Sequence, residues 1–101
     1  MGYGIFWSFR NRRHREVSRF VKRASSLREV RLVAFQGGQF TVVADRATAK
    51  TYLKLNALLT SANKHLFHGE PMTMVIREDV GEAETRSLLS NPGVQYVRDD
   101  V

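Results

Sequence analysis

Seven positively charged side chains lie between Arg10 and Arg23, a stretch that holds a single acid, Glu16. Arginine offers paired N–H donors to phosphate or carboxylate, and lysine offers a compact point charge. Residues 1–31 carry nine cations and two acids, a balance of 9 − 2 = +7, whereas residues 32–101 carry seven cations and eight acids, 7 − 8 = −1. The net charge of +6 therefore comes from the N-terminal third, and it predicts a partner rich in negative charge.

The elements that would position these cations begin with a helix over residues 11–25. Val17, Phe20, Val21 and Ala24 recur at helical spacing, and Asn11 is a suitable N-cap. We expect the phosphate ligands on this helix to be Arg12, Arg13, Arg15, Arg19, Lys22 and Arg23. Lys50 and Lys54, on a later helix, would extend the same surface.

Two classes of partner fit this charge. The first is nucleic acid, DNA or RNA, bound through salt-dependent contacts that do not depend on base sequence. The alternative is an acidic protein surface, which would make the chain a small inhibitor or adaptor of the phage or mobile-element type. A membrane surface is a further partner for a basic amphipathic helix.

Catalytic patterns are absent from the sequence. It contains no cysteine, no phosphate-binding loop, no dinucleotide-binding fingerprint and no Ser-His-Asp context. His65 and His68 are three residues apart, but a metal site would need further ligands, and His14 lies among the arginines. We therefore expect a binding protein without enzymatic activity, metal or cofactor.

The remaining elements follow from hydrophobic periodicity and turn residues. The longest is a helix within residues 45–69, where Tyr52, Leu55, Leu59, Ala62 and Leu66 form one stripe between a possible cap at Asp45 and a stop at Gly69. The other predicted elements are strands at 3–9, 29–35, 40–44, 72–77 and 94–98, and a short helix at 82–90.

This order, β-α-β-β-α-β followed by α-β, predicts a single α+β domain over residues 1–101. Its first six elements match the split βαββαβ, or ferredoxin-like, sandwich, with an added C-terminal helix and edge strand. Ile5-Phe6-Trp7 and GGQFTVV resemble the first and third strands of the RNA-recognition motif. Phe40 is the one aromatic residue in the third-strand segment, so the chain is not assigned to that family.

Alternation along the predicted strands separates two faces of the sheet. If the helices cover the face that holds Val30, Leu32 and Phe40, the opposite face exposes a second apolar set. This set is Val33, Phe35, Val43 and Val75. Exposed apolar patches commonly mark contact surfaces, so we expect a homodimer through this open face.

The sequence has no apolar run near the roughly 18 residues that a membrane-spanning helix needs. The lack of cysteine fits a reducing compartment. We therefore expect a soluble, cytoplasmic protein.

Overall fold

The computed structural model describes residues 2–66, 71–78 and 80–99, with residues 2–11 described as backbone. Three helices and four strands follow one another along this part of the chain. They are α1 (Gly2–Ser25), β1 (Val30–Gln36), β2 (Gln39–Ala44), α2 (Ala49–Lys64), β3 (Thr73–Glu78), α3 (Glu82–Leu89) and β4 (Val94–Val97).

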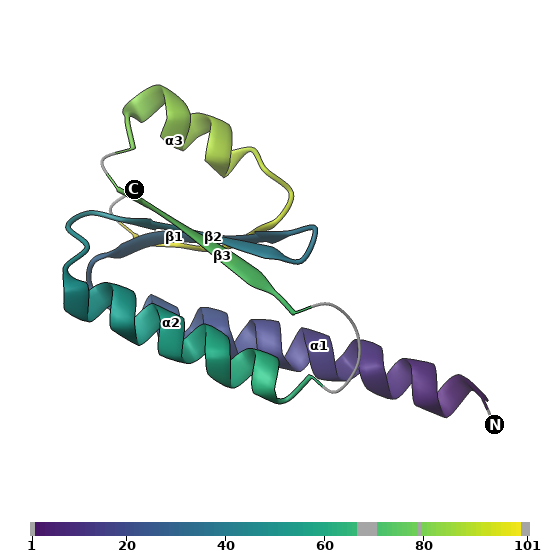
Figure 1. The fold of residues 1–101 in the computed structure, drawn as a ribbon. Coiled ribbons are helices and arrows are strands. Elements are labelled where there is room, and N and C mark those ends of the chain that lie inside the picture. Colours follow the sequence, from purple (N-terminus) through teal and green to yellow (C-terminus); the bar gives the residue numbers. More distant parts are fainter. Residues whose placement is uncertain (1, 67–70, 79, 100–101) are drawn as a thin grey trace.

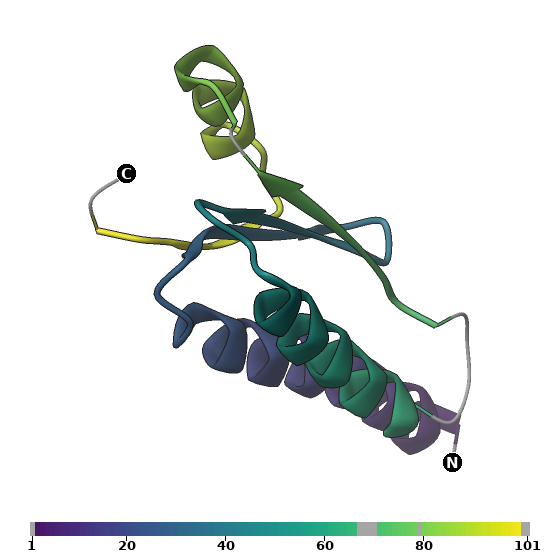
Figure 2. The ribbon, with the colours of Figure 1, turned by 60° about the vertical axis from the view of Figure 1, so that its left-hand side comes forward.

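The elements form three layers (Figure 1). The sheet is central, α1 and α2 lie side by side on one face, and α3 lies on the other; Figure 2 shows the same arrangement from a second direction. The N-terminal turns of α1 extend past the sheet and past α2. None of the described helices is long and apolar enough to cross a lipid bilayer.

The predicted strand at residues 3–9 is wrong, because this segment forms the first turns of α1. Aromatic residues are common in strands, but neither proline nor any other break separates this segment from the basic helix. Asn11 therefore lies inside a helix of 24 residues and is not its cap. The resemblance of Ile5-Phe6-Trp7 to the first strand of the RNA-recognition motif does not hold, because these residues are helical.

The second helix is shorter than predicted. Asp45 is not its cap: the hydroxyl of Thr48 accepts a hydrogen bond from the Thr51 backbone N–H, and the Thr51 hydroxyl accepts one from the Thr48 N–H. This reciprocal capping box satisfies amides that would otherwise lack partners. The helix ends at Lys64 with His65 as C-cap, and Gly69 lies outside the described residues.

The sheet confirms an α+β class but does not show the ferredoxin-like order. Its strand order is β3-β2-β1-β4, and β3 runs parallel to β2. Helix α2 carries the chain back along the sheet between these two strands, which is the connection that parallel neighbours require. The strands and the short helix predicted after residue 28 are confirmed to within one residue at each end.

A tight turn and a bulge set which residues face the helices. Gly37 and Gly38 both have positive φ, as a two-residue hairpin turn demands, and they join β1 to β2. Between Val30 and Leu32 the register of β1 against β2 shifts, so that Arg31 is an extra residue. One extra residue reverses the alternation along a strand.

The predicted exposed apolar face is therefore wrong. Val33 is buried and Phe35 half-buried against α1 and α2, in a core that also contains Val30, Phe40 and Leu55. The bulge places Val30 and Val33 on the same side of the sheet.

Val43 is buried on the opposite face, in a second core with Leu32, Ala34 and Val80. Helix α3 covers this face and brings Leu88 against it. Val75, at 42% exposure, is the member of the predicted set that remains exposed. The reason for predicting a homodimer through an open sheet face no longer holds, because α3 covers that face.

Candidate nucleic-acid interface

The rotational setting of α1 is fixed by its apolar side. Val17, Phe20 and Ala24 are buried against the sheet, and the ring of Phe20 stacks on that of Phe40 with 4.0 Å between centroids. Residues at these spacings lie on one side of a helix. With this side of α1 fixed against the sheet, helical spacing gives the direction in which each of the other residues in 12–25 projects from the helix axis.

Five of the six predicted phosphate ligands fall on one arc of α1. At about 100° per residue they lie within roughly 100° of one another around the helix axis, beside the buried side. We call this group the cationic stripe: Arg12, Arg15, Arg19, Lys22 and Arg23. Arg12 is half-buried and the other four are exposed.

The last turn of α1 suits the positive charge that the stripe concentrates there. Lys22 and Arg23 lie in this turn, where the carbonyl ends of a helix favour cations. The hydroxyls of Ser25 and Ser26 donate to the carbonyl oxygens of Lys22 and Arg23 and so satisfy two terminal acceptors.

Arg13 is separated from the stripe. Its guanidinium lies over the ring of Phe35, 5.8 Å from the centroid, so it faces the sheet side of α1. It also approaches the β1–β2 turn, where a Cβ added to Gly38 would lie 3.0 Å from a guanidinium nitrogen. These contacts give Arg13 a packing role against the hairpin.

Glu16 lies beside the stripe and is buried, at 4% exposure. One of its carboxylate oxygens is 3.5 Å from a guanidinium nitrogen of Arg19, whose side chain is 43% exposed. The other oxygen, Oε2, has no hydrogen-bond partner among the described residues. A buried carboxylate depends strongly on its remaining partner, so Glu16 restrains Arg19.

Lys50 and Lys54 are exposed on α2, one helical turn apart. They belong to the helix that lies beside α1 (Figure 1), so the two sets of cations occupy the same layer of the molecule. Their participation in one surface remains a prediction.

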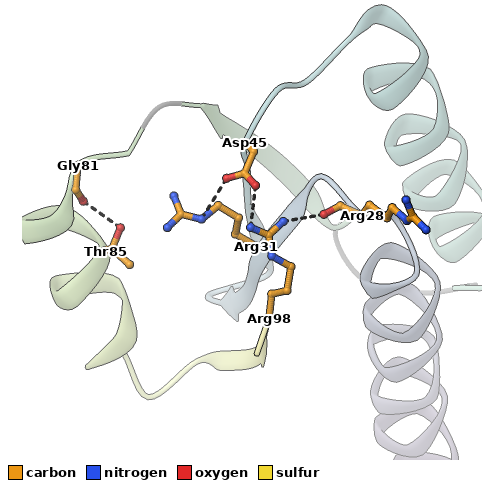
Figure 3. A network of polar contacts seen from close by, with 6 residues as sticks. All are labelled: Arg28, Arg31, Asp45, Gly81, Thr85 and Arg98. Atoms are coloured by element: carbon orange, nitrogen blue, oxygen red, sulfur yellow. Dashed lines mark hydrogen bonds and ion pairs between the residues drawn. The ribbon is translucent and has the colours of Figure 1, made fainter. Parts of the chain in front are cut away.

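A second group of arginines has a different environment (Figure 3). Asp45 follows β2. One of its carboxylate oxygens forms an ion pair with Arg31, 3.2 Å from Nε, and the other accepts a hydrogen bond of 2.7 Å from the guanidinium of Arg98. Arg98 also donates to the carbonyl oxygen of Arg28 at 2.6 Å. We call Asp45, Arg31 and Arg98 the Asp45 cluster; it joins the ends of β2, β1 and β4, and sequence reasoning missed it because its members are far apart along the chain.

The histidines offer no metal site in the part of the chain that is described. His65 is the exposed C-cap of α2, His14 is exposed on α1, and His68 lies outside the described residues. Within that part of the chain, no three or more His, Cys, Asp or Glu side chains are grouped so that they could hold a metal ion.

Comparison with known proteins assigns no relative to this chain: no protein-family model matches it, and neither a curated protein nor a solved structure is significantly similar.

Proposed function

We propose that this chain is a nucleic-acid-binding protein that contacts phosphates through the cationic stripe of α1, without enzymatic activity. The observation that carries the proposal is the gathering of five cations on one arc of a helix whose single acid, Glu16, is buried. Helix α1 holds seven cations and one acid, 7 − 1 = +6, which equals the net charge of the whole chain.

The dimensions of the stripe support this partner. From Arg12 to Arg23 is 11 residues, which is about 16 Å along a helix that rises about 1.5 Å per residue. Successive phosphates of one strand in duplex DNA rise about 3.4 Å, so about five steps cover the same length. Measured along the two helix axes, the stripe thus offers positive charge at about the density at which one strand offers negative charge.

The test is a salt series of binding titrations against duplex DNA, single-stranded DNA and structured RNA. Five phosphate contacts give a log–log slope of about −4.5 on duplex and about −3.5 on single strands. Duplex affinity should then fall about 500-fold between roughly 50 and 200 mM salt.

Absence of binding to all three at about 50 mM salt would contradict the proposal, because electrostatic contacts are strong at this concentration. That result would favour the alternative partner, an acidic protein surface that the same arginines would contact.

A further inference from the structure

The two outer strands of the sheet differ in how their edges are protected. Strand β4 has four residues and pairs with β1 through a register irregularity between Val33 and Ala34. Strand β3 has six residues and pairs with β2 in unbroken register. Short, irregular edges resist the addition of another strand, whereas long regular edges invite it.

The direction of the backbone groups identifies which part of β3 is open. The Thr73 N–H donates to the carbonyl oxygen of Gly38, so the backbone N–H and C=O groups of Thr73 point toward β2. Backbone groups alternate in direction along a strand, so those of Val75 also face β2 and those of Met74 and Ile76 point away from the sheet.

One end of this edge is closed by a side chain. The amide of Asn63 on α2 accepts from the Met72 N–H at 2.8 Å and donates to the Met72 carbonyl oxygen at 2.9 Å. The side chain of Asn63 therefore occupies the place that a neighbouring strand would take beside Met72. The open edge begins at Met74.

Apolar side chains flank this edge on both faces. Val75 is 42% exposed on the α3 side, and Met74 and Ile76 are half-buried on the α1–α2 side. No described strand pairs with the outer edge of β3. Within the sheet, these three side chains therefore have a neighbouring strand, β2, on one side only.

We propose that the β3 edge pairs antiparallel with the β3 edge of a second copy, with Val75 on the two-fold axis. In this register Met74 lies opposite Ile76 of the second copy, and Val75 lies opposite its own counterpart. Each Met74–Ile76 pair exchanges two backbone hydrogen bonds, so the two pairs supply about four.

The charges and the geometry agree with a second copy as the occupant. The register places apolar residues opposite apolar residues on both faces, and such cross-strand pairs stabilise a sheet. Arg77 lies opposite Thr73 and retains its own ion pair with Glu84. A two-fold axis perpendicular to the sheet keeps both α1 helices on the same side of an eight-stranded sheet, which is 4 + 4 strands.

The lack of cysteine in the chain gives a direct test. Opposed residues of a non-hydrogen-bonded antiparallel pair have Cα atoms about 4.5 Å apart, which lies within the span of a disulfide. The Val75→Cys protein should therefore form a covalent dimer under mild oxidation. The control is Leu89→Cys on α3, since Leu89 has nearly the same exposure, 41%, and lies away from the edge.

Sedimentation of the unmodified chain gives a second readout. We expect a dimer at micromolar concentrations, and we expect Val75→Lys to weaken it at least tenfold while Leu89→Lys leaves it unchanged. In the dimer, amide exchange at Ile76 should slow as concentration rises, whereas exchange at Val75 should not depend on concentration.

Three results would overturn this proposal: a monomer across the micromolar range, equal cross-linking of the Val75→Cys and Leu89→Cys proteins, or undiminished dimerisation of Val75→Lys. Each can occur whether or not the chain binds nucleic acid.

Discussion

The cationic stripe of α1 and the Asp45 cluster both gather arginines, but they differ in what surrounds the charge. In the Asp45 cluster two guanidinium groups share one carboxylate, and the side chains of Arg31 and Arg98 are each 25% exposed. The five cations of the stripe belong to a helix whose single acid, Glu16, is buried, and four of the five are exposed.

The difference shows why a count of arginines does not locate a binding surface. Charge that is compensated within the fold joins strands and contributes to stability, and it is weakly available to a partner. Charge gathered on one largely exposed side of a helix contributes much to the electrostatic field outside the molecule. Substitutions in the two regions should therefore change different measured quantities.

The largest expected effect concerns the contrast between a buried and an exposed residue of α1. Phe20→Ala should lower the free energy of unfolding by about 3–5 kcal/mol, since Phe20 is buried and stacks on Phe40. Arg15→Ala, at an exposed position of the stripe, should change it by no more than about 0.5 kcal/mol and should reduce the salt slope of binding. Urea denaturation measures the free energy of unfolding; a large loss of stability in Arg15→Ala would show that the stripe is structural.

The Asp45 cluster should respond in the opposite sense. Asp45→Asn removes the carboxylate shared by Arg31 and Arg98 and should cost about 1–2 kcal/mol of stability. The two arginines keep their charges, so the salt slope should not decrease. Denaturation and binding titrations on the same sample check both; a decreased slope would mean that these arginines also bind phosphate.

Glu16→Gln should strengthen binding. Its carboxylate holds Arg19 and opposes the approach of phosphate, so its neutral replacement should raise duplex affinity about tenfold at low salt, equivalent to about 1.4 kcal/mol. Glu16→Asp is the control that keeps the charge. Unchanged or weakened binding in Glu16→Gln would show that Arg19 does not contact phosphate.

Arg13→Ala gives the smallest effect and separates Arg13 from its neighbours in sequence. Loss of its contact with the Phe35 ring should cost about 0.5–1 kcal/mol of stability. The salt slope should remain that of the unmodified chain. A slope reduced as much as in Arg15→Ala would place Arg13 in the phosphate-binding group after all.

The sequence predicts these elements unevenly, for physical reasons. The apolar spacing of Val17, Phe20 and Ala24 predicts the buried side of α1 correctly, because helical periodicity is local. The bulge at Arg31 is not visible as a pattern, yet it reverses the faces of β1 and so misplaces Val33 and Phe35. The Asp45 cluster depends on contacts between distant segments, which local spacing does not encode.

The proposed phosphate ligands show the same division. Helical spacing joins Arg12, Arg15, Arg19, Lys22 and Arg23, and the structure keeps them together on exposed and half-exposed positions. Arg13 differs because its direction depends on the hairpin that packs beside α1. The prediction of a strand at residues 3–9 was wrong, because aromatic content is only weak evidence for a strand where nothing in the sequence interrupts the helix that follows.

The most direct test of the central claim compares two triple variants that lose the same charge. One carries Arg15→Ala, Arg19→Ala and Lys22→Ala on the stripe; the other carries Arg46→Ala, Lys64→Ala and Arg86→Ala at exposed positions off α1. Titrated with duplex DNA over a salt series, the stripe variant should show a log–log slope smaller in magnitude by about 2.7, at about 0.9 per contact, and the second variant should keep nearly the full slope. Equal reductions in both variants would contradict the account, since they would show that net charge, and not the stripe on α1, governs binding.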